Sequence, residues 1–350
     1  MKPNVLKRST EEPLAGGVPR RLRRLTVLGA VAAVLVTGAC GTSDTAKPAA
    51  GGASTKAPVA VAPAVLGEDE YVENASAFVD AAKDTWDAKA VTVKIELGEM
   101  FFKPKNVDLE AGKPYVLELV NKGKVKHEFT ADKFFRGSAM RKVESDSSEF
   151  KAPFMTEIEV LAGKTVKLFV IPVIPGSFVT LCEIAGHREA GMEGTITVTG
   201  EKPAAPVAVL GSKKAGKWLQ NGPALVAAAS ATWDAKKSTV RIEAGEAGAK
   251  MFFKPNKINL KVGTPYVLEM VNVGKTKHEF TSAQFFPTMA FRKAEDTSGE
   301  YKTLLVKEAE VFPGKQLDLY LIPTKAGTFK IVCELPGHEQ AGMVGTITVK

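Results

Sequence analysis

The chain contains an internal duplication, and this feature constrains its fold more than any other. Phe101-Phe-Lys-Pro104 recurs as Phe252-Phe-Lys-Pro255, an offset of 151 residues in a chain of 350. Trp86-Asp-Ala-Lys recurs at Trp233 with an offset of 147, so the second copy has about four additional residues near 245–250. An offset that stays constant over so long a stretch indicates two tandem copies of one folding unit.

Each copy also carries one cysteine, two histidines and one methionine at matching positions. Cysteine, histidine and methionine follow one another in the spacing C-x4-H-x4-M, and a further histidine lies 55 residues before the cysteine, in the phrase Lys-His-Glu-Phe-Thr. The two sets are His127, Cys182, His187 and Met192, and His278, Cys333, His338 and Met343. Two histidines, a cysteine and a weak methionine are the ligands of a blue-copper electron-transfer site.

A structural role for these residues is the ordinary alternative, because a lone buried cysteine or histidine is more often a packing residue. Two complete sets in register argue against it, since they use all four histidines of the chain. A structural zinc site is disfavoured because pairs of ligands at C-x2-4-C spacing are absent. The remaining methionines lack such support, and we interpret them as core or surface residues.

Periodicity predicts an all-β fold. Val91–Leu97 alternates apolar and polar residues with period two, as a half-buried strand does, and similar runs follow at intervals of about ten residues. Glycine and proline separate these runs, which is typical of an antiparallel β-sandwich. A short helix is expected before each first strand, at 75–89 and 225–236. The segments 131–153 and 282–304 have no clean period, and we expect a short helix and a loop there.

The N-terminal region has the pattern of an export signal. Basic residues precede an apolar run over 25–39, which is too short for the roughly 20 residues of a membrane-spanning helix. Val-Thr-Gly-Ala-Cys40 resembles a bacterial lipobox, which implies cleavage before Cys40 and lipid attachment to it; plain secretion or an uncleaved anchor is the alternative. Residues 41–66 are rich in Ala, Pro, Gly and Thr and predict a flexible tether.

The charge of the chain does not favour a nucleic-acid partner. The formal net charge is +8, but the first 39 residues hold seven basic and two acidic residues, which leaves only +3 for the rest. Such a mixed surface is typical of an ordinary solvated protein.

Both copies resemble the cupredoxins, the family of plastocyanin, azurin and rusticyanin. The C-x4-H-x4-M loop that leads into Gly-Thr-Ile-Thr-Val carries the resemblance, which covers about 90–199 and 241–350. It implies two Greek-key β-sandwiches and two copper ions that cycle between Cu(I) and Cu(II). The implied ligands are the two sets above, with a short copper–cysteine bond, a long axial methionine, and the loop histidines near the surface.

The chain departs from the family beside its ligands. Glutamate follows the first histidine and the cysteine in both copies, at Glu128, Glu183, Glu279 and Glu334. Family members often have Asn and Thr or Ser there, which tie the two ligand segments together. An ionised carboxylate close to copper would stabilise Cu(II). Alternatively, these side chains point to solvent or pair with Lys126 or Lys277.

The resemblance implies an electron carrier that exchanges single electrons with redox proteins such as cytochromes, oxidases or reductases. Because no histidine is left for a substrate-binding copper centre, we expect the chain not to be an enzyme. Periplasmic copper storage or delivery is the alternative function, and a tethered scaffold with vestigial sites is a third.

The expected localisation is the periplasmic or cell-surface face of a bacterial membrane, with a lipid anchor. The expected organisation is a signal peptide at 1–39, a lipid-anchored tether at 40–66, cupredoxin domains at 67–199 and 213–350, and a linker at 200–212.

Overall fold

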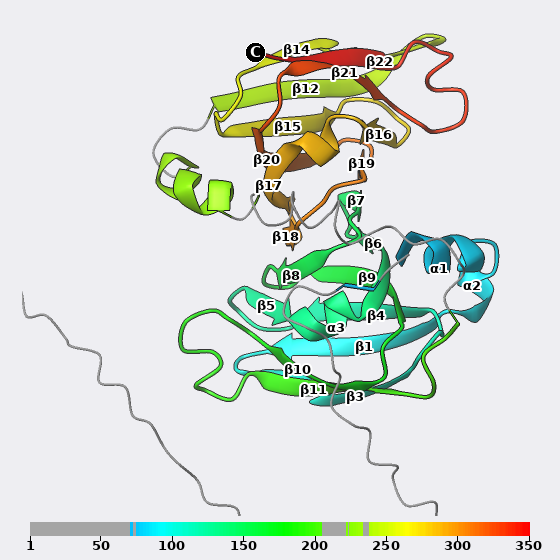
Figure 1. Ribbon diagram of the computed structural model, residues 1–350, viewed down its shortest axis with the longest axis vertical. Helices are drawn as coiled ribbons and strands as arrows, with labels where there is room; N and C mark the ends of the chain where they lie inside the picture. Colours follow the sequence, from blue (N-terminus) through cyan, green and yellow to red (C-terminus); the bar gives the residue numbers. More distant parts are fainter. Residues whose placement is uncertain (1–70, 73–74, 205–221, 223, 234–237) are drawn as a thin grey trace, which may run out of the picture. The chain divides into compact units, whose positions relative to one another are not determined.

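The structure is a computed structural model that describes residues 71–72, 75–204, 222, 224–233 and 238–350 (Figure 1). The expected signal peptide, the lipid attachment at Cys40, the tether at 40–66 and most of the linker at 200–212 lie outside the described residues. Within the described part of the chain, no helix is both long and apolar enough to cross a bilayer.

The first domain begins with two short helices and continues as β-strands with one further helix. The helices are α1 (Ala75–Ala82), α2 (Trp86–Lys89) and α3 (Asp132–Arg136). The strands are β1 (Val91–Gly98), β2 (Phe101–Lys103), β3 (Asn106–Glu110), β4 (Tyr115–Asn121), β5 (His127–Thr130), β6 (Ser138–Glu144), β7 (Ser148–Lys151), β8 (Met155–Val160), β9 (Thr165–Pro172), β10 (Gly176–Leu181) and β11 (Glu193–Thr199).

The second domain repeats this order. A helix at 224–233 precedes its strands, and the 3-10 helix η1 (Phe286–Thr288) takes the place of α3. The strands are β12 (Ser238–Ala247), β13 (Lys250–Lys254), β14 (Lys257–Leu260), β15 (Tyr266–Asn272), β16 (His278–Thr281), β17 (Met289–Glu295), β18 (Gly299–Thr303), β19 (Glu308–Val311), β20 (Gln316–Pro323), β21 (Gly327–Val332) and β22 (Val344–Val349). The predicted all-β fold of two tandem sandwiches, each preceded by a short helix, is confirmed.

The helix before each first strand packs a tryptophan against the sandwich. Trp86 is buried with Phe78 and Ile171, and Trp233 is buried with Tyr320. Alanine dominates both helical segments, which favours a helix. The large tryptophan ring supplies apolar area for the contact between the helix and the sandwich.

The two domains share their sheets. In one sheet, β7 of the first domain pairs antiparallel with β19 of the second. In the other, β18 of the second domain pairs antiparallel with β8 of the first. In each 11-stranded sheet the strands of one domain therefore continue, edge to edge, into the strands of the other. Exposed sheet edges are hazards for aggregation, and this pairing covers one edge strand of each domain in each of the two sheets.

The strand pairing between the domains corrects the expectation for 131–153 and 282–304. A short helix is present in each segment, but the remainder forms the strand pairs β6–β7 and β17–β18 rather than a loop. The strands β7 and β18 each pair on one side with a strand of the other domain. A pattern of apolar residues that is set by a distant partner has no reason to show a clean local period.

One apolar core runs through both domains. Phe150 of β7 is fully buried and stacks on Phe291 of β17, with ring centroids 5.8 Å apart. Both rings belong to the same cluster of buried side chains as the sandwich interiors. Because the core is continuous across the shared strands, the two domains are expected to unfold together.

A buried asparagine fixes the turn before the first histidine of each set. Asn272 Nδ2 donates to the carbonyls of Thr276 (2.7 Å) and Val311 (2.8 Å), and Asn272 Oδ1 accepts from the Gly274 amide (2.8 Å). Asn121 makes the equivalent bonds in the first domain. The turn is thereby held to the neighbouring strand, so His278 enters its sheet at a fixed place.

The shared core predicts the effect of Phe150→Ala. Truncation of a fully buried phenylalanine should lower the free energy of unfolding by about 3–5 kcal/mol. Calorimetry should show one transition for the wild-type protein, and the variant should move the whole transition to lower temperature. Phe101→Ala, at a ring that is 43% exposed, is the matched control and should shift it little. Two separate transitions in the wild-type protein would contradict a common core.

The asparagine turn predicts a second result. Asn272→Asp keeps the shape of the side chain but removes both N–H donors, so the Val311 carbonyl loses its partner. We expect a loss of about 1–3 kcal/mol in the free energy of unfolding, measured with urea. Asn259→Asp, on an exposed position of β14, is the control. Equal stability of the two variants would show that the turn does not depend on Asn272.

Candidate metal centres

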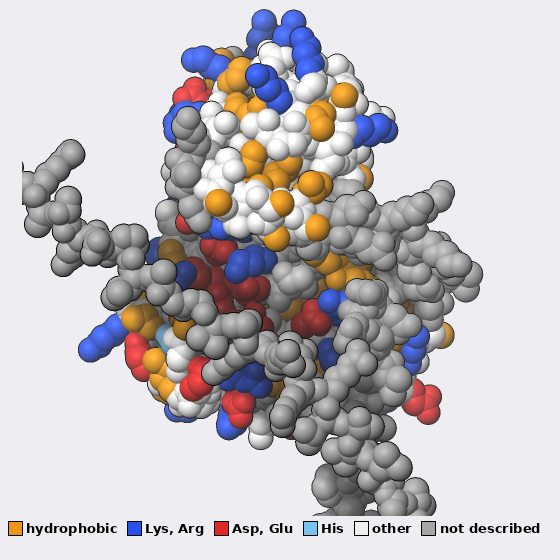
Figure 2. All heavy atoms as spheres, turned by 60° about the vertical axis from the view of Figure 1, so that its left-hand side comes forward, with side chains coloured by type: hydrophobic (Ala, Val, Ile, Leu, Met, Phe, Trp, Pro, Cys, Tyr) orange, Lys and Arg blue, Asp and Glu red, His pale blue; other side chains and the backbone are white. Residues whose placement is uncertain are grey.

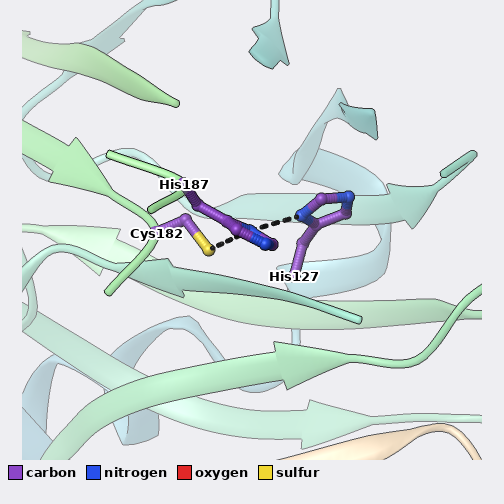
Figure 3. Close-up of side chains that lie close together, drawn as sticks. All are labelled: His127, Cys182 and His187. Carbon is purple, nitrogen blue, oxygen red and sulfur yellow. Dashed lines mark hydrogen bonds between the residues drawn. The ribbon is translucent and has the colours of Figure 1, made fainter. Parts of the chain in front are cut away.

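The structure brings two histidines and the cysteine of each copy together at one end of its sandwich. In the first domain His127 is the first residue of β5, whereas Cys182 and His187 lie on the loop that joins β10 to β11. Figure 3 shows the three side chains pointing toward one another. The strand β5 lies between β8 and β10 in its sheet; His127 pairs with Val160 of β8, and β10 pairs with β5 at Thr130.

The distances within the first site fit a small metal ion. His127 Nδ1 and His187 Nδ1 are 3.3 Å apart, and Cys182 Sγ is 3.3 Å from His187 Nδ1. The three ligand atoms all lie within 4.8 Å of one another. An ion held at about 2.0–2.3 Å by nitrogen and sulfur donors needs these atoms about 3.5 Å apart. The donor set and its spacing therefore suit a soft to borderline cation such as copper.

The second site repeats this geometry. His278 Nδ1 lies 3.3 Å from His338 Nδ1, and Cys333 Sγ lies 3.2 Å from His338 Nδ1. The three atoms again lie within 4.8 Å of one another. Two independent copies of one chain segment thus converge on the same arrangement of donors.

Burial keeps the donor atoms ready for a cation. Burial lowers the pKa of His127 and of His278, which favours the neutral imidazole, the form that offers a nitrogen lone pair. Burial raises the pKa of the Cys182 and Cys333 thiols, while backbone N–H groups oppose that rise. A bound cation deprotonates a thiol that coordinates it. The amides of Glu128 and Glu279 donate to the two sulfur atoms at 3.3 Å and would stabilise the thiolates.

The methionines lie where the ligand loop closes on itself. The Met192 amide donates to the His187 carbonyl (3.0 Å), and the Cys182 amide donates to the Met192 carbonyl (3.1 Å). The same two bonds join Met343 to His338 and Cys333. Both methionine side chains are fully buried. The backbone therefore fixes cysteine, histidine and methionine as one rigid unit.

The loop histidines lie nearest to solvent. His187 is 9% exposed and His338 is half-buried, whereas His127 and His278 are almost completely buried. Each site is thus closed toward the core and borders solvent on the side of its loop histidine.

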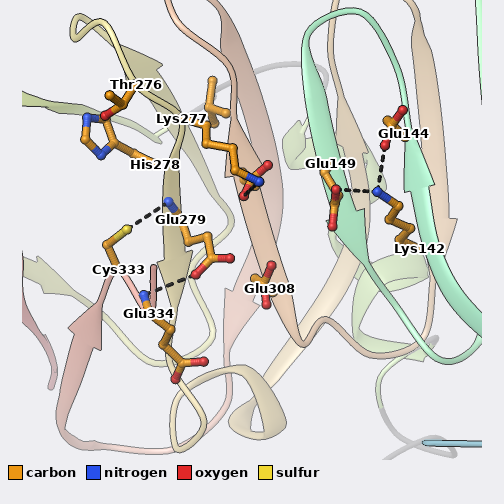
Figure 4. A network of polar contacts seen from close by, with 12 residues as sticks. Lys142, Glu144, Glu149, Thr276, Lys277, His278, Glu279, Glu308, Cys333 and Glu334 are labelled. Atoms are coloured by element: carbon orange, nitrogen blue, oxygen red, sulfur yellow. Dashed lines mark hydrogen bonds and ion pairs between the residues drawn. The ribbon is translucent and has the colours of Figure 1, made fainter. Parts of the chain in front are cut away.

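The glutamates beside the ligands divide into two kinds. Glu183 and Glu334, which follow the cysteines, are exposed, while Glu128 and Glu279, which follow the first histidines, are buried. Figure 4 shows Glu279 directed toward Glu334, whose amide donates to Glu279 Oε2 at 3.1 Å. In the second domain this carboxylate ties the two ligand segments together, as Asn and Thr or Ser often do in the cupredoxins that the sequence resembles.

Glu128 and Glu279 do not pair with the lysines that precede the histidines. Lys126 pairs with Glu159 (2.6 Å) and Lys277 pairs with Glu310 (3.1 Å). Burial, followed by the charge of Glu157, raises the pKa of Glu128 to about 7. Burial, followed by the charge of Glu308, raises the pKa of Glu279 to about 8. Each carboxyl therefore favours its protonated form more than an exposed glutamate does.

These glutamates belong to two acidic clusters that cross the shared strands. Lys151 of the first domain pairs with Glu308 of the second, and Lys302 of the second domain pairs with Glu157 of the first (2.6 Å). Figure 2 shows acidic side chains gathered in a recess with lysines among them. Through Glu128 and Glu279, the ligand strands β5 and β16 therefore border the contact between the domains.

Sequence reasoning missed a second pair of glutamates, Glu99 and Glu246. Glu246 Oε1 lies 3.2 Å from Nε2 of His278, on the side of the ring away from the cysteine. Glu99 lies near His127 in the first domain. Their offset of 147 residues, shared with the tryptophans, is the signal that could have marked them as equivalent positions.

Comparisons with other proteins place both halves of the chain in one family. The family described as "Cupredoxin-like domain" matches residues 74–198 and 222–349. The copper-resistant cuproprotein CopI of Pseudomonas aeruginosa is 30% identical over 129 residues, which cover 29% of this chain and 71% of that protein. CopI of Rubrivivax gelatinosus is 29% identical over 119 residues, which cover 33% of this chain and 70% of that protein.

Solved structures of copper enzymes are also similar, at low identity. A copper nitrite reductase from Thermus scotoductus has 14% identity and a TM-score of 0.27, with 75% of this chain and 62% of that one covered. A multicopper oxidase from Campylobacter jejuni has 12% identity and a TM-score of 0.30, with 75% and 64% covered. This chain thus spans less than two thirds of the length of either.

These neighbours correct one expectation. The prediction that the chain is not an enzyme, drawn from its histidine count, is wrong as an exclusion, because the similar structures include nitrite reductases and multicopper oxidases. The match of the family to both halves covers most of the described residues. The chain belongs to the cupredoxin-like domain family, with one such domain in each half.

Proposed function

We propose that this chain is an extracytoplasmic copper protein whose two type 1 sites each take up and release one electron. The copper-resistant cuproproteins to which it is similar support copper binding, and the export-signal pattern at the N-terminus supports a location outside the cytoplasm. The single observation that carries the proposal is the convergence of two buried sets of one cysteine and two histidines with ligand atoms 3.2–3.3 Å apart.

The site residues are suited to fast electron exchange because they are held before any ion binds. His127 is fixed by its pairing with Val160 of β8, and the loop from Cys182 to Met192 is fixed by its own backbone bonds. A copper ion would supply the Cu(I)/Cu(II) couple. Rigid ligands change position little between two charge states, so little energy is spent on reorganisation when an electron moves.

The proposed ligands are His127, Cys182, His187 and Met192 in one site, and His278, Cys333, His338 and Met343 in the other. The side-chain sulfur of each methionine would be the weak axial ligand. His187 and His338 border solvent and would face an electron-transfer partner, which we propose to be another extracytoplasmic redox protein.

Copper storage or delivery is the second candidate, and the printed description of the CopI proteins as copper-resistant favours it. Both candidates use the same ligands. They differ in the state that must be stable, because a carrier has to hold Cu(I) and Cu(II) alike, whereas a delivery protein has to release its ion to an acceptor.

Cysteine variants test the proposed sites. The copper-loaded wild-type chain should bind two ions and absorb intensely in the visible range. Cys182→Ser and Cys333→Ser should each lose one ion and about half of that absorption, since each removes one thiolate. The double variant should lose both. Met251→Leu, at a methionine outside the proposed sets, is the control and should keep full colour.

Electrochemistry separates the two candidate functions. A reversible one-electron couple at each site, with fast electron self-exchange, is expected for the carrier. A colourless Cu(I) form that passes its ion to a soluble Cu(I) chelator and has no stable Cu(II) state would instead establish copper delivery.

A further inference from the structure

The buried histidine of the second site has a carboxylate on its outer nitrogen. His278 turns Nδ1 toward Cys333 and His338, and its Nε2 lies 3.2 Å from Glu246 Oε1. The His278 side chain is fully buried and that of Glu246 is 19% exposed. Nε2 has no hydrogen-bond partner in this structure, so the contact with Glu246 is an electrostatic one.

Glu246 is held in this position by the turn that precedes His278. Its Oε2 accepts from the Lys275 amide (2.9 Å), and its Oε1 accepts from the Thr276 amide (3.0 Å) and from the Thr276 hydroxyl. These three hydrogen bonds stabilise the ionised carboxylate and hold its negative charge beside the imidazole.

Gly274 makes room for this pair. A Cβ atom at residue 274 would overlap the Glu246 carboxylate and would lie 2.9 Å from His278 Nε2. Only glycine lets the carboxylate reach the ring, because real Cβ atoms do not approach other atoms so closely.

The first domain places a carboxylate near the equivalent ring, without the short ion-pair contact of the second domain. A Cβ atom at Gly123 would lie 2.8 Å from both Glu99 Oε1 and His127 Nε2, and the Lys124 amide donates to Glu99. Glu99 is exposed, whereas Glu246 is half-buried. Solvent therefore screens the charge of Glu99 more strongly.

A carboxylate behind a ligating imidazole has a defined chemical effect. It holds the proton on the outer nitrogen, leaves the inner nitrogen free to bind, and makes that nitrogen a stronger donor. A stronger donor stabilises the more highly charged state of a bound ion. In this chain the outer carboxylate would favour Cu(II) over Cu(I).

We propose that Glu246, and more weakly Glu99, are positioning residues that act through His278 and His127 to lower the reduction potentials of the two sites, the second further than the first. This inference rests on the proposed function for its redox meaning. It goes beyond that function because it predicts different reduction potentials for two sites whose ligands are the same.

The experiment isolates one site at a time in the full-length chain. Cys182→Ser leaves only the second complete ligand set, and Glu246→Gln is added to it. We expect the affinity for Cu(II) to fall about tenfold with the affinity for Cu(I) unchanged. For a one-electron couple this raises the potential by about 59 mV. Glu243→Gln, a half-exposed carboxylate on the same strand that pairs with Arg241 and Lys254, is the matched control and should change neither affinity.

Gly274→Ala provides an independent variant, since its methyl group should displace the carboxylate and raise the potential in the same direction. Glu99→Gln in the Cys333→Ser background should give a smaller rise. Equal potentials in all variants, with only a lower melting temperature for Glu246→Gln, would overturn the proposal and leave Glu246 as a residue that merely ties the turn.

Two readouts separate this inference from the proposed function. Nitrogen NMR of the metal-free protein should show His278 with its proton on Nε2, and Glu246→Gln should weaken that preference. The ratio of Zn(II) to Cu(I) affinity should fall in the same variant, because a divalent ion gains more from the carboxylate. Both results would hold even if the chain delivers copper and exchanges no electrons, whereas an unchanged tautomer and ratio would overturn the inference alone.

Discussion

The edge-to-edge pairing of the two domains' sheets is the interaction that joins both halves of the chain into one core. The strand of the first histidine, β5, pairs with β8, and β8 pairs on its other side with β18 of the second domain. The same holds for β16, β19 and β7. Each ligand strand is therefore an interior strand that lies one strand away from the junction between the domains. A fixed ligand position is what an ion with two charge states requires.

The shared strands also explain the buried glutamates. Glu128 and Glu279 alternate with inward-facing ligands on short strands, so they point to the opposite face of the sheet. In an isolated sandwich that face would meet water. Here Lys302 and Lys151 arrive from the other domain and partly balance the charge, which lets acidic side chains lie within a protein interface.

The ligand loop and most strands could be predicted from the sequence because the residues that define each of them lie close together in the chain. Cysteine, histidine and methionine share one loop, and alternation along β1 or β4 reflects a sheet with one buried face. The strands β7 and β18 could not be predicted in this way, since each pairs with a strand about 150 positions away in the chain. Glu246 escaped notice for a similar reason, because it reaches His278 from a strand some 30 residues earlier and only through the gap left by Gly274.

Duplication has left the two sites alike in their ligands and different in their surroundings. The insertion near 245–250 lengthens β12 to ten residues against eight in β1, and Glu246 lies in the lengthened part. Glu246 is consequently more enclosed and accepts bonds from Thr276, where the first domain has Val125, which lacks a side-chain donor. Two redox sites with identical ligands and identical surroundings would have equal potentials, and an electron would gain no direction between them. On our proposal, a few residues outside the ligand set would separate the two potentials, and this would make the second copy more than a repetition of the first.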